Sequence, residues 1–108
     1  MLDVTIFYPV AMRRDDVARA GRHALARTRV DRRLAEVATE GVFVLRPWDF
    51  DDLRVIAQVN HNIPVGVAEP LRSTLERELR SALMRIANGG KINVIISLPP
   101  VTYTRSGV

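Results

Sequence analysis

Four short stretches of the chain have the pattern of strands, and in three of them apolar and polar residues alternate as in a strand with one buried face. In residues 2–8, leucine, valine, isoleucine and tyrosine occupy one parity and more polar residues occupy most of the other. The same alternation recurs in residues 53–59 and 91–98, and residues 42–46 form a short run of mostly apolar, β-type residues. Pro9, the acidic segment at 47–52 and the Pro99–Pro100 pair follow these stretches, so we predict four strands bounded by turns.

Two longer segments have apolar residues at three- and four-residue spacing, typical of amphipathic helices. The first is expected to begin at Asp15 or Asp16, because a short carboxylate there can accept backbone N–H bonds. Its periodicity shifts near Arg29, and Asp31 is expected to cap a second helical segment that runs through Ala38. The inner stripe of the first helix consists of small residues and predicts close packing on a sheet: Val17, Ala20, Gly21, Ala24 and Thr28.

The second long helix is predicted to start near Glu69, with Pro70 at a first helical position where its missing N–H is not needed. Its apolar stripe is continuous: Leu71, Leu75, Leu79, Ala82, Leu83 and Ile86. Asn88, Gly89 and Gly90 are expected to end it through a left-handed stop.

An offset of about fifty residues relates the two parts of the chain. VARAGRHAL at 17–25 aligns with VAEPLRSTL at 67–75, and GVFVL at 41–45 aligns with KINVI at 91–95. We therefore predict one domain, residues 1–108, with half-repeats 1–50 and 51–100 and a tail 101–108. The order βαββαβ predicts an α+β, ferredoxin-like sandwich: a four-stranded antiparallel sheet, strand order 4-1-3-2, with two helices on one face.

In that topology the second and fourth strands lie at the sheet edges, and the fourth is rich in β-branched residues. Such an edge invites pairing with another chain, so we predict a protein interface formed by Ile92, Val94, Ile95, Ile96 and Leu98. The alternative is that the tail VTYTRSGV folds back over this strand.

Composition narrows the classes of function. The chain has no cysteine, which excludes disulfides, thiolate zinc sites and thiol nucleophiles. No apolar run approaches the roughly 20 residues of a membrane span, and the interrupted first dozen residues are interpreted as a strand, not a signal peptide. A cytoplasmic location, or a place in a larger intracellular or virion assembly, is therefore expected. The net charge is +4, with fifteen arginines against the single Lys91.

The sequence contains few residues that could act in catalysis. His23 and His61 are the only histidines, and the sequence offers no nucleophile motif or acid/base pair to accompany them. The aspartates at 49, 51 and 52 lack the spacing of a calcium loop. NGGK at 88–91 leads from helix to strand, opposite to a phosphate-binding loop. We therefore predict no catalytic, cofactor-binding or metal-binding residues.

Arginine is concentrated at residues 13–33, which hold eight arginines and three aspartates. Guanidinium groups on one helix neutralise phosphates, so Arg19, Arg22 and Arg27 are candidate nucleic-acid contacts. The open face of the sheet is expected to add aromatic and polar groups: Phe7, Phe43, Arg54 and Gln58. No RNA-recognition signature is present.

Residues 59–101 resemble the second half of the alkaline-shock envelope-stress family. The matching positions are Ile63, Pro64, Val67, Ala68, Leu71, Arg72, Gly89 and Val94. Over the whole length, the element order and the phrase FYPVAMRRDDVARA are also similar to the ferredoxin-like cytosolic domain of small-conductance mechanosensitive channels. Both resemblances imply a non-catalytic scaffold.

Three hypotheses follow. The first is a non-enzymatic structural module that self-assembles or docks on a protein partner through its sheet edge and helix face, with a homo-oligomer as the expected state. The alternative is an arginine-dependent nucleic-acid-binding protein. The third is a cofactor-independent enzyme that uses a cleft beside the sheet, and it would require an unusual environment at His61.

Overall fold

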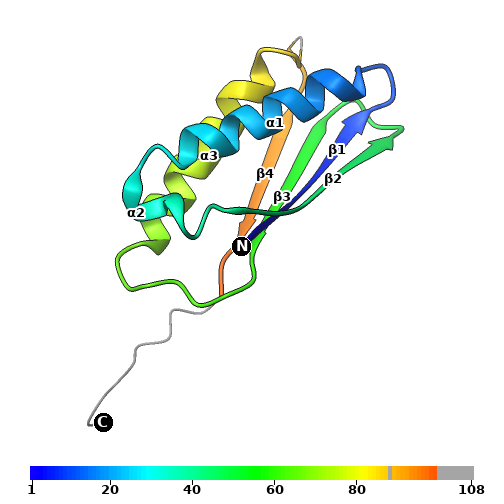
Figure 1. Cartoon of the computed structure of the whole chain (residues 1–108). Helices are drawn as coiled ribbons and strands as arrows, with labels where there is room; N and C mark the ends of the chain where they lie inside the picture. The colour runs from blue at the N-terminus through cyan, green and yellow to red at the C-terminus, as the bar shows by residue number, and fades with distance from the viewer. Residues whose placement is uncertain (88, 100–108) are drawn as a thin grey trace, which may run out of the picture.

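The computed structural model describes residues 1–87 and 89–99 (Figure 1). Four strands and three helices follow one another along the chain. Their bounds are β1 Leu2–Pro9, α1 Arg14–Thr28, α2 Arg32–Ala35, β2 Glu40–Trp48, β3 Leu53–Val59, α3 Ala68–Met84 and β4 Ile92–Ser97. The tail at 101–108, and with it the prediction that this tail covers the last strand, lies outside the described residues.

The strands form one mixed sheet in the order β2-β1-β3-β4. β1 and β2 are parallel, β3 and β4 are parallel, and β1 and β3 meet antiparallel in the centre. The α+β class and the edge positions of β2 and β4 were predicted correctly. The antiparallel 4-1-3-2 ferredoxin-like order is wrong, because each edge strand pairs with the first strand of its own half.

The reason for this error is physical. In both arrangements a helix carries the chain back over the same sheet face, so the same residues of each strand face the helices. What differs is the neighbour of each edge strand: in the predicted order β2 lies beside β3 and β4 beside β1, whereas in the structure β2 lies beside β1 and β4 beside β3. The alternation of polar and apolar residues indicates which face of a strand is buried. It does not indicate which strand lies beside it in the sheet.

The core lies between this sheet and the two long helices, which run side by side over one face (Figure 1). β1 contributes Leu2, Val4, Ile6 and Tyr8, and β3 contributes Leu53, Val55, Ala57 and Val59. From α3 the leucines at 71, 75, 79 and 83 are fully buried, as the stripe predicted. This burial of apolar surface is the main stabilising contribution to the fold.

α1 lies close to the sheet because its inner stripe is small. A Cβ atom on Gly21 would lie 2.8 Å from both the Ile6 Cδ1 and the Phe43 Cζ atoms, so a larger residue would push the helix away. Phe43 therefore packs on the helix side and not on the open face, where it had been predicted. The open face carries Phe7, whose ring lies 5.1 Å from that of Trp48, and Arg54, which lies 5.2 Å from the Trp48 ring.

The helix starts differ in part from the predictions. Asp15 and Asp16 lie in the first turn of α1 and do not cap it, because the N-cap position is Arg13. Asp31 does cap α2, accepting from the backbone N–H of Arg33 at 3.0 Å. Side-chain and backbone hydrogen bonds from Arg33 lower the pKa of Asp31 below its usual value. α2 ends at Ala35, three residues earlier than expected.

Candidate functional site

The first residues of β1 and the residues just after β3 lie together at one end of the sheet. Leu2 pairs with Val59 in the antiparallel ladder, and the backbone N–H of Asn60 donates to the Met1 carbonyl at 3.3 Å. This register places His61 beside the start of the chain. The amino group of Met1 donates a hydrogen bond of 2.6 Å to Nδ1 of His61.

Asp3 connects three strand ends at the same place. The register between β1 and β2 shifts between Leu2 and Val4, which leaves an irregular step in β2. Asp3 Oδ1 accepts the backbone N–H of Val42 there at 2.8 Å, and Oδ2 accepts the side-chain amide of Asn60. The carboxylate thus fixes the residue that precedes His61. We call Met1, Asp3, Asn60 and His61 the strand-end cluster.

Chemically, the strand-end cluster unites two groups that bind and release protons. Histidine is the side chain that most often transfers protons near neutral pH. Its neighbour here is an amine, and both are exposed to solvent. The structure thus shows a hydrogen-bonded pair of titratable groups that the sequence did not reveal. Its second member is a main-chain group sixty residues away, which no side-chain motif reveals.

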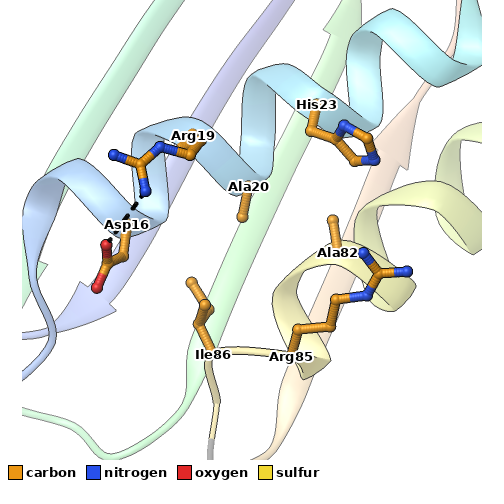
Figure 2. A pocket seen from close by; sticks show the side chains of 7 residues that line it. All are labelled: Asp16, Arg19, Ala20, His23, Ala82, Arg85 and Ile86. Carbon is orange, nitrogen blue, oxygen red and sulfur yellow. Dashed lines mark ion pairs between the residues drawn. The ribbon is translucent and has the colours of Figure 1, made fainter.

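A second feature is a groove between α1 and α3 (Figure 2). It is an open hollow with a volume of about 250 Å³. Its apolar lining is Ala20, Ala82 and Ile86, and its polar lining is Asp16, Arg19, His23 and Arg85. A neighbouring hollow of about 350 Å³ shares His23, Ala82 and Arg85 with it and adds Arg27, Glu78 and Ser81. We call the two together the helix groove.

The three arginines predicted to contact nucleic acid do not form one surface. Arg22 turns toward the sheet, where it pairs with Glu40 at 3.4 Å and lies 4.5 Å from the centre of the Phe43 ring. Arg27 pairs with Glu78 at 3.8 Å, in the helix groove. Arg19 also lines that groove and pairs with Asp16 at 3.8 Å.

Four of the five residues predicted as an interface lie on the helix side of the sheet, and one lies on the open face. Ile92 is buried, and Val94, Ile96 and Leu98 pack against the core on the helix side. Ile95 lies on the open face and is 47% exposed. Whether this strand contacts another chain stays a prediction, but the side chains available for it are fewer than the sequence suggested.

The free edge of β4 is partly covered by α3. The Lys91 carbonyl accepts from the Leu53 N–H in β3, so alternate carbonyls, including those of Ile92 and Ile96, point to the outer edge. Arg80 Nη1 donates to the Ile92 carbonyl at 2.9 Å, and Arg72 Nη1 donates to the Ile96 carbonyl at 3.0 Å. Charged side chains on an edge oppose pairing with another strand.

The acidic turn between β2 and β3 has a structural role. The Asp52 carbonyl accepts the Trp48 indole N–H at 2.8 Å, and its carboxylate accepts the Asn93 amide at 3.1 Å. Within residues 1–87 and 89–99, no group of three histidine, aspartate or glutamate side chains is placed to hold a metal ion. Among the described helices, none has the length and apolar content needed to cross a membrane.

Comparison with known proteins shows which solved structures have a similar fold. No family model matches the chain, and no curated protein matches it. A crystal structure described as 5-carboxymethyl-2-hydroxymuconate delta-isomerase is similar over 95% of this chain and 85% of that one, with 12% identity and a TM-score of 0.57. A structure described as an F6 fused 4-OT wild type asymmetric trimer is similar over 95% and 92%, with 7% identity and a TM-score of 0.50.

These neighbours correct the functional predictions. The chains that share this tautomerase-like fold are an isomerase and 4-OT, so the prediction of a non-enzymatic module, and the exclusion of an enzyme, are wrong. The neighbours do not test the nucleic-acid alternative, which stays a prediction from sequence. Neither neighbour is an alkaline-shock protein or a mechanosensitive channel domain. The two family resemblances therefore stay predictions from sequence.

Proposed function

We propose that this protein is an isomerase of the tautomerase type, which moves a proton within a small unsaturated organic acid, and that His61 carries the proton. The observation that supports this proposal most directly is the 2.6 Å hydrogen bond between His61 Nδ1 and the Met1 amino group. The fold of the two structural neighbours supports the reaction class.

The proposed reaction needs only proton transfer. A base removes a proton from one carbon or oxygen of the substrate, the double bond shifts, and the same proton or another is returned at a different carbon. One bond to hydrogen breaks and one forms, so no oxidant, reductant or cofactor is required. A histidine that exchanges its proton with a neighbouring amine can serve as both base and acid in such a cycle.

The substrate is proposed to be an anion. The chain carries a net charge of +4, which raises the local concentration of anionic molecules at its surface. One structural neighbour is named for a substrate that carries carboxymethyl and muconate groups. A carboxylate next to the reacting carbons also makes a proton easier to remove, since the resulting negative charge is delocalised.

The test is ketonisation of the enol form of phenylpyruvate, followed by ultraviolet absorbance. The protein is expected to accelerate it, and His61→Gln is expected to lower kcat/KM about 100-fold or more, because general acid–base catalysis contributes on the order of 10²–10⁴. Asn62→Ala, in the same exposed turn, is the matched control and should keep the rate. A His61→Gln variant as active as the unmodified protein would refute the assignment.

We further propose that the protein forms a homo-oligomer through the sheet face opposite the helices. One structural neighbour is described as a trimer. On this protein the face carries exposed Ile95 and half-buried Thr5, Val44 and Ile56 in one row across the four strands. Apolar residues in a continuous row on an uncovered face are typical of an interface.

A further inference from the structure

His23 and Arg85 face each other across the helix groove. They come from different helices, α1 and α3, and Figure 2 shows both side chains extending over Ala82. Both are exposed. Within residues 1–87 and 89–99, neither side chain takes part in a hydrogen bond or ion pair, although Asp16 and Glu78 line the same groove.

The acidic groups of the helix groove are already engaged with other arginines. Asp16 lies 3.8 Å from Arg19, and Glu78 lies 3.8 Å from Arg27 and 3.5 Å from Arg77. Arg85 thus stays without a carboxylate partner among the described residues, beside a second cation-forming side chain. An anion between Arg85 and His23 would supply the missing charge, and a guanidinium binds a carboxylate through two parallel hydrogen bonds.

The floor of the groove is apolar. Ala82 is only 7% exposed, and Ala20 and Ile86 are half-buried beside it. Two alanines facing each other from neighbouring helices leave the hollow of about 250 Å³ open, where longer side chains would fill it. An apolar surface next to a guanidinium and an imidazole matches an organic anion with a hydrocarbon body better than it matches a simple inorganic ion.

We propose that the helix groove binds a small organic carboxylate, with the carboxylate between Arg85 and His23 and the hydrocarbon body over Ala20, Ala82 and Ile86. This site is separate from the strand-end cluster. His61 lies at the start of β1, whereas α1, which carries Asp16 and Arg19, begins after the other end of that strand (Figure 1). The proposal does not depend on the proposed isomerase activity.

The experiment is a ¹H–¹⁵N nuclear magnetic resonance titration of the full chain with 3-phenylpropionate. The backbone signals of Ala20, His23, Ala82 and Ile86 are expected to shift together with one dissociation constant. Arg85→Gln should weaken binding at least tenfold. Arg32→Gln removes the same charge from an exposed position on α2 and should leave the dissociation constant unchanged.

Two ligand controls separate charge from hydrocarbon. 3-Phenylpropan-1-ol has the same body without the carboxylate, and acetate has the carboxylate without the body, so each should bind at least tenfold more weakly. Inorganic phosphate tests whether a simple ion is sufficient. If the alcohol or phosphate binds as tightly as 3-phenylpropionate, the assigned ligand class is wrong.

A second variant tests the groove without changing its charge. Ala20→Leu places a larger side chain over the floor and should abolish the titration shifts, while thermal unfolding checks that the protein remains folded. Equal affinity in Arg85→Gln and Arg32→Gln, or shifts that map outside the groove, would overturn the proposal.

Discussion

At Gly41 the chain has no room for a side chain. A Cβ atom there would collide with the carboxylate of Asp3 and lie 3.2 Å from the Leu2 carbonyl oxygen. The glycine is needed for this close approach, which lets Asp3 reach both the Val42 N–H and the Asn60 amide. A residue of β2 thereby helps to hold the turn that carries His61.

Because of this contact, substitutions at Gly41 and Asp3 are expected to have non-additive effects on the free energy of unfolding. Gly41→Ala is expected to destabilise the protein by about 1–3 kcal/mol, the usual range for overpacking. Asp3→Ala is expected to cost about 1 kcal/mol, because two donors lose their acceptor. The double variant should cost less than the sum, since removing the carboxylate removes the main collision. Urea unfolding measures all three, and an additive result would contradict the contact.

The limits of sequence interpretation are also visible at single residues. Leu79 was assigned correctly to the core, because it belongs to a local pattern. His61 entered only the third hypothesis, which named no partner for it. Its partner is the Met1 amine, which becomes a neighbour through the register of β1 on β3, and a register between distant strands leaves no local pattern.

Among the elements, β4 was expected to be an open edge, and the structure shows that α3 reaches over it. Arg72 and Arg80 lie eight residues apart on the helix and bind carbonyls four residues apart on the strand, because a strand rises about twice as far per residue as a helix. The strands and helices themselves were predicted well from their periodicity. Their order in the sheet was not, because both orders bury the same residues.

Replacing both arginines is expected to expose the edge. Arg72→Gln with Arg80→Gln should lower stability by about 1–2 kcal/mol, a small amount because both side chains are more than 40% exposed. It should also cause association that grows with concentration, measured by light scattering. Arg77→Gln, on the same helix but bound to Glu78, is the control. Unchanged scattering in the double variant would mean that these contacts do not protect the edge.

For the whole molecule, the two faces of the sheet have different environments. The helices cover one, and the other presents a row of mostly apolar residues with Trp48, Phe7 and Arg54 packed at its side. Sequence patterning predicted that one face would be covered by helices. It could not show whether a partner covers the second face, because a partner's contacts are not encoded in the periodicity of a single chain.

The proposed homo-oligomer is tested by the mass of the protein in solution. The unmodified protein should give a mass larger than one chain by light scattering at high micromolar concentration, and Ile95→Lys should shift it to the mass of one chain, because a charge would be buried in the interface. Met84→Lys changes an exposed apolar residue on the helix side and should preserve the assembly. A strictly monomeric unmodified protein would exclude the oligomer.

The parallel pairing within each half has a consequence for how the molecule can be divided. β1 and β2 bond to each other, as do β3 and β4, so a break in the turn at 49–52 would sever none of these ladders. The resulting pieces would meet along a single boundary, formed by the β1–β3 ladder and the α1–α3 packing. A ferredoxin-like order would not permit such a division, because its halves interleave. In this protein, each piece retains every backbone bond that its own strands make with one another.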